Sequence, residues 1–292
     1  MNEPGGKILQ FMKINKTGIL LFALIFISLS ISGFAQSAAL AKTNGDLPFA
    51  AGETLTYEGK FSKIIRGIAV ADMTFTVGSD PETGNILLNA EAHSKGTLLK
   101  IFRFSFLQTI SSTVAPDGFS VLRTVKHDVQ KERVRDSEAV FDYENDLVTY
   151  VETDPKDASR PPRKIASQIG PDVHDLISGL YSLRMQPLTV GGEFNISVSD
   201  SGLVYEIPIK VTAREKQKSI FGKVWCYRLE PQIFGEGRLI SGEGSMIIWV
   251  MDDERRIPIR SQVNASIGRI EVKLRRAQNL IKLDKAPKNK DS

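Results

Sequence analysis

Apolar and polar residues alternate along most of this 292-residue chain, and the alternation constrains the fold more than any other feature. A period of two is typical of β-strands that bury one face. Leu55, Tyr57 and Phe61 share one face of a first segment, and Phe75 and Val77 share a face of the next. Short turns rather than helices separate these segments, which favours antiparallel pairing. The pattern predicts an all-β, mostly antiparallel fold, in which a curved sheet forms a β-roll or an open barrel.

Later segments extend the same pattern. Phe102, Phe104 and Phe106 alternate before a turn, and beyond that turn the apolar residues stand at odd positions. These residues are Phe119, Val121, Val125 and Val129. Pro208 lies within a predicted strand at 203–214. Because proline has no N–H to donate to a neighbouring strand, Pro208 predicts an edge strand or a β-bulge.

Residues 171–185 depart from the period of two and predict one amphipathic helix near the middle of the chain. Their apolar residues recur at the spacing of one helix face, and they are Val173, Leu176, Ile177, Leu180 and Tyr181. Pro171 suits the first turn, Asp175 suits the positive end, and Pro187 ends the helix. An exposed loop is expected at 153–170, before the helix. We expect the helix to act as a plug or lid.

The loop and the helix separate two stretches of strands, residues 48–152 and 187–276. Both stretches open with a proline, an apolar residue, two further residues and a glycine, at Pro48–Gly52 and Pro187–Gly191. This similarity suggests that the β domain, residues 42–276, arose by internal duplication. Two short matches can also arise by chance, so unrelated halves stay the alternative.

Residues 1–41 have the layout of a secretory signal peptide. Basic residues precede an apolar run at 18–29, and the small residues after it favour cleavage after Ala35 or Ala41. The run is shorter than the roughly 20 residues that span a bilayer, although an uncleaved membrane anchor stays the alternative. No cysteine stands just after the run, which excludes a lipoprotein. The expected location is the periplasm.

The formal net charge of +4 comes largely from the two ends of the chain. Residues 277–292 contain Lys282, Lys285, Lys288 and Lys290 and little apolar content, which predicts a basic, flexible tail. The body between the two ends is near neutral and lacks the basic stripe that binds nucleic acid. We therefore expect no nucleic-acid partner.

Residues that could carry chemistry are few. His93 and His127 lie in predicted strands and His174 on the predicted helix, and no two histidines are four residues apart. Cys226, the single cysteine, lies in an apolar strand, where a buried thiol is expected and a bond to another chain is the alternative. The sequence predicts no catalytic residues, no metal and no cofactor. A hydrolase is the least favoured function.

Charged residues gather near the predicted helix and at a late hairpin. Asp175 and Arg184 belong to the first group, and Asp253, Arg256 and Arg260 to the second. We expect Arg256 or Arg260 to point inward and form a buried bridge with Asp175 that ties helix to sheet. Arg184 is a second candidate for such a bridge. A solvated hairpin tip is the alternative.

Three motifs resemble those of the DUF3108 family of exported bacterial proteins. They are Gly52–Tyr57, Asp175–Arg184 and Trp249–Pro258, in the order in which the family has them. The resemblance covers residues 48–276. It implies an exported, mostly antiparallel β-protein, and it supplies no catalytic residues because the family has no assigned function.

A curved sheet with one helix can leave an apolar groove beneath that helix, which predicts binding of an apolar or amphipathic ligand such as a lipid or an envelope glycan. The expected lining residues are Phe102, Phe104, Phe106, Leu180 and Tyr181. The alternative is a closed core in a non-enzymatic interaction or scaffold protein of the cell envelope. Such a protein docks partners through open strand edges.

Overall fold

The structure is a computed structural model that describes residues 47–62 and 67–282. The predicted signal peptide with its cleavage sites, and the predicted tail from residue 283 onward, lie outside the described residues. The helices are α2 (Gly96–Phe102), α3 (Leu176–Ser182) and the 3-10 helix η2 (Leu183–Met185). The strands are β1 (Thr54–Ser62), β2 (Ile68–Ser79), β3 (Ile86–Ser94), β4 (Phe106–Val114), β5 (Val121–Gln130), β6 (Arg133–Asp142), β7 (Leu147–Thr153), β8 (Arg163–Gln168), β9 (Val173–His174), β10 (Glu193–Asp200), β11 (Leu203–Ser219), β12 (Gly222–Pro231), β13 (Gly244–Met251), β14 (Pro258–Ala265) and β15 (Gly268–Gln278).

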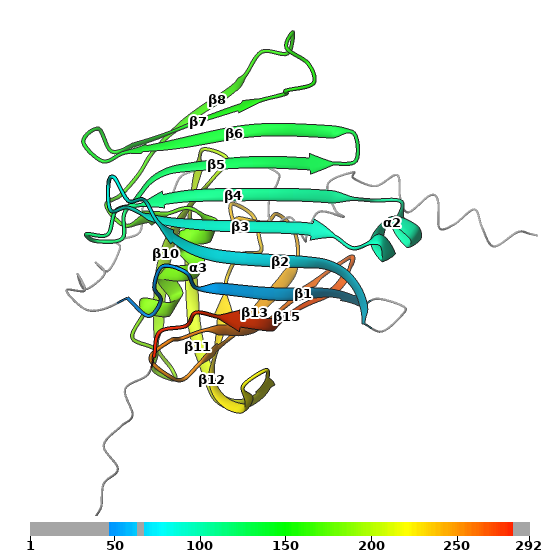
Figure 1. Ribbon diagram of the computed structural model, residues 1–292, viewed down its shortest axis with the longest axis vertical. Helices are drawn as coiled ribbons and strands as arrows, with labels where there is room; N and C mark the ends of the chain where they lie inside the picture. The colour runs from blue at the N-terminus through cyan, green and yellow to red at the C-terminus, as the bar shows by residue number, and fades with distance from the viewer. Residues whose placement is uncertain (1–46, 63–66, 283–292) are drawn as a thin grey trace, which may run out of the picture.

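All fifteen strands belong to one sheet, in the order β8-β7-β6-β5-β4-β3-β2-β1-β15-β14-β13-β12-β11-β10-β9. Within the described chain, the one parallel pairing between these strands is that of β9 with β10. β1 lies beside β15, so the first and last strands join two runs of hairpins (Figure 1). The predicted all-β, mostly antiparallel fold is confirmed.

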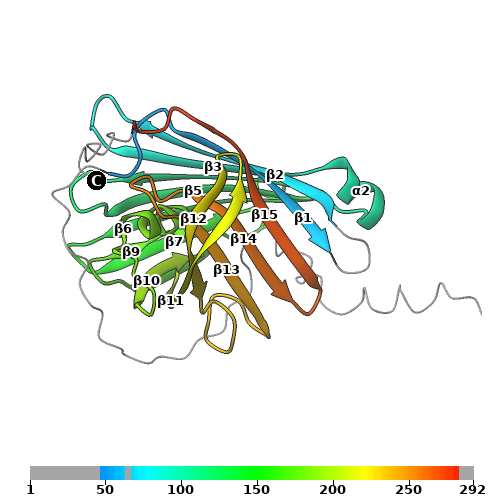
Figure 2. The same cartoon turned by 90° about the horizontal axis from the view of Figure 1, so that it is seen from below.

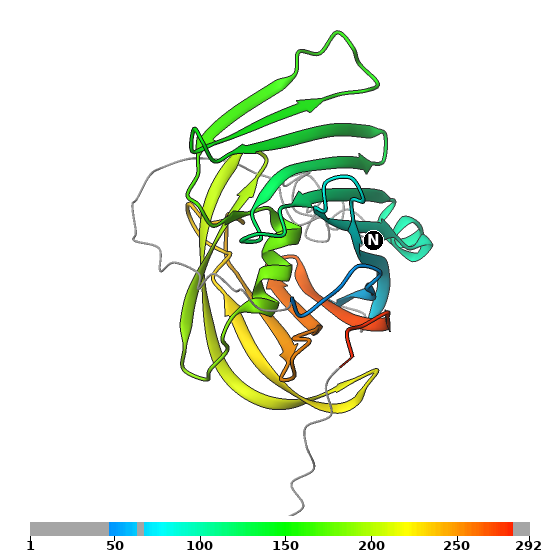
Figure 3. The same ribbon diagram turned by 60° about the vertical axis from the view of Figure 1, so that its left-hand side comes forward.

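The sheet curls into an open barrel around α3 (Figures 2 and 3). The tip of the β10–β11 hairpin lies inside the curve, where Ser201 and Gly202 are buried. A Cβ atom at Gly202 would lie 2.7 Å from the Cβ of Tyr150 and 2.8 Å from the Cβ of Ile165. The Ser167 hydroxyl donates to the Gly202 carbonyl at 2.6 Å. The hairpin tip therefore closes the barrel against β7 and β8.

The central helix is shorter than the prediction of 171–185. Pro171 lies before it, because Val173 and His174 form the strand β9, which pairs with β10, and the helix begins only at Leu176. Asp175 caps α3, with its Oδ1 accepting from the N–H groups of Ile177 at 2.9 Å and Ser178 at 2.7 Å. The Asp175 N–H donates in return to the Ser178 hydroxyl at 2.9 Å. This reciprocal capping box sets the start of the helix.

A second short helix, α2, replaces part of a predicted strand. Phe102 is its last residue, and Arg103 follows in the left-handed conformation with φ of 50°. The Arg103 N–H donates to the Leu99 carbonyl at 2.9 Å, which closes the helix. Of the three alternating phenylalanines, only Phe106 lies on a strand, and Phe104 lies in the connection. The predicted strand at Phe102 and Phe104 is therefore wrong.

A β-bulge reverses the faces of β5. β5 pairs Val121 with Val114 and Arg123 with Thr113, which leaves Leu122 as an extra residue. An extra residue shifts the alternation by one position. The buried residues beyond the bulge are Lys126, Asp128 and Gln130. Val125 and Val129 are only partly buried. The inner face of β5 beyond the bulge is therefore polar.

Pro208 lies in an interior strand rather than the predicted edge strand. It faces Asn195 of β10, whereas the pairing of β11 with β12 begins only at Ile209. The β12 ladder therefore does not need the N–H that Pro208 lacks. The irregularity in β11 comes later, between Val211 and Ala213.

α3 joins the two walls of the barrel. Its residues Ile177 and Tyr181 belong to a buried apolar cluster with side chains of β2–β7. Leu176 and Leu180 pack against a second cluster, formed largely by side chains of β10–β13. The helix therefore lies between the two halves of the sheet.

The two halves open with similar turns. The Gly52 N–H donates to the Val77 carbonyl at 2.7 Å, and the Gly191 N–H donates to the Val211 carbonyl at 2.8 Å. In return, the Val77 N–H donates to the Glu53 carbonyl at 3.0 Å, and the Val211 N–H donates to the Gly192 carbonyl at 2.9 Å. Both glycines have positive φ, 94° and 86°. Each turn leads into consecutive antiparallel strands, β1–β6 or β10–β15. Duplication of the halves stays a prediction, which a superposition of these strands tests.

Candidate functional site

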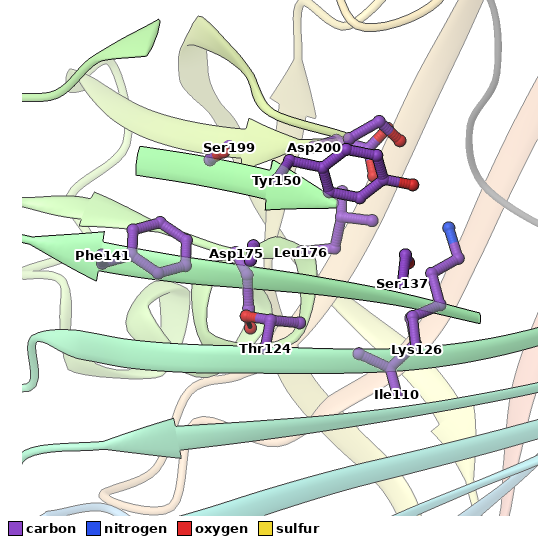
Figure 4. Close-up of a pocket in the computed structure, with 12 residues that line it drawn as sticks. Ile110, Thr124, Lys126, Ser137, Phe141, Tyr150, Asp175, Leu176, Ser199 and Asp200 are labelled. Carbon is purple, nitrogen blue, oxygen red and sulfur yellow. Dashed lines mark hydrogen bonds between the residues drawn. The ribbon is translucent and has the colours of Figure 1, made fainter. Parts of the chain in front are cut away.

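A small hollow lies inside the barrel, where the β10–β11 tip meets β5–β7 and the start of α3 (Figure 4). It holds about 410 Å³ of space, including space open to solvent, of which about 30 Å³ can hold the centre of a water-sized molecule. Its apolar lining residues are Ile110, Ala139, Phe141 and Leu176. Its hydroxyl-bearing residues are Thr124, Ser137, Tyr150, Ser199 and Ser201, and its charged residues are Lys126, Asp175 and Asp200. The hollow is therefore mixed in character.

Lys126 and Asp200 place opposite charges at the hollow. Each residue is only 8% exposed. Burial raises the pKa of Asp200, while the nearby charge of Lys126 and a 3.1 Å hydrogen bond from the Ser201 hydroxyl oppose the rise. Buried charges cost free energy unless other groups compensate them, and they concentrate at functional sites. Their position beside open space makes the hollow the candidate site.

Asp175, the third charged residue, already has hydrogen bonds at both carboxylate oxygens. In addition to the capping bonds at Oδ1, its Oδ2 accepts from the hydroxyls of Ser112 on β4 and Thr124 on β5. These bonds tie the start of α3 to the sheet. Because its oxygens are occupied, Asp175 has little capacity to act as a base or to bind a ligand.

The polar inner face continues beyond the hollow along β6 and β7. The Tyr150 hydroxyl donates to Glu152 Oε2 at 3.2 Å, and burial raises the pKa of Tyr150 to about 12. This hydroxyl therefore stays protonated at neutral pH. Arg135 Nε lies 3.7 Å from Glu152 Oε1, and the same guanidinium pairs with Asp154. A network of compensated charges therefore adjoins the hollow.

The five residues predicted to line an apolar groove do not come together. Phe102, Phe104 and Phe106 belong to an apolar cluster beside α2. Leu180 and Tyr181 instead line a void under α3, where about 10 Å³ can hold the centre of a water-sized molecule. That space is about the lower limit for one water. The two groups therefore do not form one ligand site.

A buried bridge between helix and sheet exists, and it joins Arg184 to Glu53. The guanidinium donates to both carboxylate oxygens, at 2.5 and 2.9 Å, and both side chains are buried. Arg184 also donates to the carbonyls of Pro48 at 2.9 Å and Arg255 at 3.0 Å. Such bidentate geometry with further hydrogen bonds compensates the loss of water.

The predicted bridge from Arg256 or Arg260 to Asp175 is wrong. Arg256 Nη1 lies 3.8 Å from Asp252 Oδ1, and Arg260 Nη2 lies 2.5 Å from Glu271 Oε1. The hydroxyls and backbone amides already satisfy Asp175, and the two arginines have carboxylate partners of their own.

Asp253 organises the hairpin tip itself. Its Oδ1 accepts from the N–H groups of Arg255 at 3.1 Å and Arg256 at 3.2 Å, and its Oδ2 pairs with the Arg255 guanidinium at 2.6 Å. The five charged residues that the sequence predicts near the helix and at the late hairpin are therefore distributed over the α3 cap, the Arg184 bridge, the hairpin tip and the β14–β15 pair.

His174 is buried in β9 rather than placed on the polar side of a helix. It is 3% exposed, and neither ring nitrogen has a hydrogen-bond partner among the described residues. Burial lowers the pKa of His174 to about 4, so the ring is neutral at physiological pH. His93 and His127 lie in β3 and β5, as predicted. Within residues 47–62 and 67–282, no group of three or more His, Cys, Asp or Glu side chains is placed to hold a metal ion.

Cys226 is buried in β12, as predicted. Burial raises the pKa of its thiol to about 12, with a smaller contribution from nearby carboxylates, the first of which is Asp253. The reactive form of cysteine is the thiolate. This cysteine is therefore unsuited to nucleophilic chemistry at neutral pH.

A comparison with known protein families shows to which family the chain belongs. Residues 54–275 match the family described as "Protein of unknown function (DUF3108)". The chain belongs to the DUF3108 family. The resemblance of the three sequence motifs is thereby confirmed. A comparison with curated proteins finds no match.

The fold of this DUF3108 protein is similar to that of a beta-barrel-like protein of the domain of unknown function DUF1849 from Brucella abortus. The TM-score is 0.54 at 8% sequence identity, over 77% of this chain and 96% of the other. At this identity the likeness concerns the fold alone.

Two other solved structures are more distant. A candidate exported protein with a YmcC-like fold from Bacteroides fragilis has a TM-score of 0.33 at 10% identity, over 80% of this chain and 98% of the other. A candidate lipoprotein from Parabacteroides distasonis has a TM-score of 0.31 at 9% identity, over 80% and 100%. In the described part of the DUF3108 chain, no helix combines the length and the apolar character needed to cross a membrane.

Of the polar groups of the hollow, only Asp175 could be selected from the sequence. The burial of Lys126 could not be predicted, because the extra residue Leu122 shifts the alternation and turns the even positions of β5 inward. A signal does exist for the hairpin tip, since a serine and Gly202 between two alternating segments favour a tight turn. Nothing local in the sequence indicates that this turn is buried.

Proposed function

We propose that this DUF3108 protein is an exported, non-enzymatic protein that binds a small amphipathic ligand through a hydroxyl-bearing polar group. The observation that carries the proposal is the buried pair of opposite charges, Lys126 and Asp200, beside open space. A hairpin turn normally lies on the surface. Here Asp200 and Ser201 are instead held inside the barrel.

The chemistry of the lining favours a polyol or sugar-like group. Lys126 can only donate hydrogen bonds, an ionised Asp200 can only accept them, and the hydroxyls can do both. Ligand hydroxyls also donate and accept, so they match this mixture. Phe141 and Leu176 supply apolar surface for a short apolar part. The lining favours a lipid headgroup that carries hydroxyls over a wholly apolar ligand.

The size of the hollow limits what can enter. The space for water-sized molecules has room for about two waters, which a headgroup must displace. The tip is held at Gly202 by packing against β7 and β8 and by the Ser167 hydroxyl. We therefore expect only the terminal hydroxyls of the headgroup to enter, with the rest of the headgroup and the acyl part outside.

A non-enzymatic role agrees with the hydrogen bonding and burial of the residues that could take part in catalysis. Asp175 is saturated with hydrogen bonds, the ring nitrogens of His174 have no hydrogen-bond partner among the described residues, and Cys226 is a buried thiol. None of these residues forms a nucleophile–base pair of the kind that covalent catalysis needs.

Calorimetric titration with dihexanoyl-phosphatidylglycerol tests the proposal. We expect saturable binding that Asp200→Asn weakens by about tenfold or more, because a charged hydrogen-bond acceptor is lost. Asp117→Asn, in an exposed turn, is the matched control and should leave binding unchanged. Saturable binding of a disaccharide instead of the lipid would assign a glycan ligand. No binding of either probe, or equal binding by both variants, would refute the proposal.

A second candidate function, docking of an envelope protein, is favoured by the edge of the sheet. β8 pairs with β7 alone in the sheet order, so its other edge can accept a strand. A photo-crosslinker at the exposed Ala166 should then trap a protein partner in cells, while one at the exposed Thr153 of β7 should not. Absence of a product at Ala166 would argue against this function.

A further inference from the structure

α2 projects from one end of the barrel (Figures 1 and 2). Leu98 anchors it in an apolar cluster with Val70, Ala71 and Phe106. The Thr97 hydroxyl also donates to a backbone carbonyl of β2. One face of the short helix is thereby fixed to the sheet, and the other face is left to solvent.

The part of α2 that is left to solvent carries large apolar side chains that are unusually exposed. Leu99 is 52% exposed and Ile101 is 51% exposed, the two highest values among the large apolar residues that the structure describes. Residues two apart on a helix point to opposite flanks, so Leu99 and Ile101 lie on either side of Lys100. Together they give both flanks of the projection exposed apolar surface, called here the α2 patch. The patch lies outside the hollow and has no role in the proposed ligand site.

Positive charges surround this patch. Lys100 and Arg103 are exposed on α2, and the exposed Lys131 lies in the β5–β6 turn with its ammonium 5.8 Å from the centre of the Phe104 ring. No carboxylate of the described residues lies within ion-pairing distance of Lys100, Arg103 or Lys131. Lys95, by contrast, pairs with two carboxylates at 2.9 and 3.2 Å. Apolar side chains between uncompensated cations are typical of segments that lie on anionic membranes.

We infer that the exposed part of α2, defined by Leu99, Lys100, Ile101 and Arg103, docks onto the surface of a bilayer that contains anionic lipids. The charge of the patch is complementary to such a surface. A stable protein interface buries about 800 Å² on each partner, far more than two side chains offer. A bilayer accepts a small apolar patch and supplies many anionic groups, so it fits better than a protein partner.

An environment-sensitive dye at Ile101→Cys tests this inference in the full chain, expressed with its own leader and recovered after processing. The native Cys226 is buried and should not react with the dye. We expect blue-shifted, brighter emission with phosphatidylcholine vesicles that contain about 30% phosphatidylglycerol, and no change with phosphatidylcholine alone. The same dye at Val190→Cys, an exposed apolar position elsewhere, should not respond.

Charge variants test the same surface without a label. We expect Lys100→Gln with Arg103→Gln to weaken sedimentation with the anionic vesicles by about fivefold or more. Lys210→Gln with Lys223→Gln, which removes two exposed charges of the β11–β12 hairpin, should have little effect. Equal binding to neutral vesicles, equal loss in both variants, or a dye that responds only to added envelope proteins would overturn the inference.

Discussion

At the scale of single residues, the Arg184–Glu53 pair holds three distant segments together. The two residues are 131 positions apart, and the arginine also reaches backbone carbonyls at Pro48 and Arg255. Its guanidinium lies 5.0 Å from the centre of the Phe49 ring. η2, the start of β1 and the β13–β14 turn therefore meet at one buried cation.

Loss of this cation should be strongly destabilising. We expect Arg184→Met to lower the free energy of unfolding by about 3–5 kcal/mol, because the Glu53 carboxylate stays buried without a partner. Urea denaturation at neutral pH measures the change. Arg214→Met, which removes a partly exposed partner of Asp252, is the control and should cost less than about 1 kcal/mol. Equal losses of unfolding free energy in the two variants would contradict the claim that burial makes the Arg184–Glu53 pair costly to break.

His174 should make the fold sensitive to acid. Burial lowers its pKa from 6.5 to about 4, so the unfolded chain binds more protons than the folded chain between these values. Its contribution to stability is therefore complete above pH 6.5 and is lost as the pH falls toward 4. One group can change the free energy of unfolding by about 1.4 kcal/mol per pH unit in this window.

Denaturant unfolding at several pH values between 7 and 4 tests this dependence. We expect His174→Leu to flatten the acid side of the stability profile, whereas His93→Asn, at a partly exposed position on β3, should leave it unchanged. An unchanged slope in His174→Leu would show that the ring does not stay neutral in the folded protein.

The sequence allows some residue roles to be predicted and not others. Apolar neighbours indicate the burial of Cys226, and that burial is found. Arg184 can be chosen as a candidate for a buried pair, because it ends an apolar helical segment. Its partner Glu53 cannot be chosen, since the two meet only when the sheet brings the start of β1 to the end of η2.

At the scale of elements, the buried β10–β11 tip decides how the barrel closes. Gly202 has φ of 81°, and the space at its Cβ position is filled by side-chain atoms of Tyr150 and Ile165. A residue with a side chain would therefore have both an unfavourable backbone conformation and an overlap.

A pair of glycine variants separates these two effects. Gly202→Ala and Gly222→Ala both place alanine at positive φ, 81° and 87°, but no atom lies within 4 Å of the Cβ position at Gly222. We expect Gly202→Ala to lower the free energy of unfolding by about 2 kcal/mol more than Gly222→Ala. Hydrogen exchange should also quicken in β7 and β8 in the first variant alone. Equal effects would mean that the tip does not pack against these strands.

Element types were mispredicted in two places, since α2 replaces part of a predicted strand and β8 lies within the loop expected at 153–170. Boundaries and faces were mispredicted elsewhere. The helix at 171–185 is mispredicted at its start because Val173 suits both a helix face and β9, and pairing with β10 decides between them. The faces of β5 are mispredicted because one extra residue, Leu122, inverts the alternation. Both errors come from contacts with neighbouring strands, which local patterns do not contain.

At the scale of the whole molecule, the two halves are continuous with each other. β1 and β15 pair from Thr54–Gln278 to Ser62–Arg269, and α3 packs on both walls. At this junction, one buried apolar cluster combines side chains of β1 with side chains of β12–β15. We therefore expect one cooperative unfolding transition.

Differential scanning calorimetry of the full chain measures this cooperativity. The calorimetric and van't Hoff enthalpies should agree, as they do for a two-state domain. Two resolved transitions, or a van't Hoff enthalpy about half the calorimetric one, would instead indicate halves that unfold independently.

The overall architecture could be predicted because alternation and short turns are local properties that repeat along the chain. The hollow could not be predicted, because it forms only where the bulged strand β5, the buried β10–β11 tip and the start of α3 meet. Lys126 and Asp200 are 74 positions apart in the numbering, and only the curl of the sheet brings them to the same space.

A crystal structure of the protein grown with dihexanoyl-phosphatidylglycerol is the most direct test of the hollow as a ligand site. The expected result is headgroup density within hydrogen-bond distance of Lys126 and Asp200, with the acyl chains directed out of the barrel. A hollow that holds only water while the lipid binds elsewhere, or not at all, would contradict the proposed function.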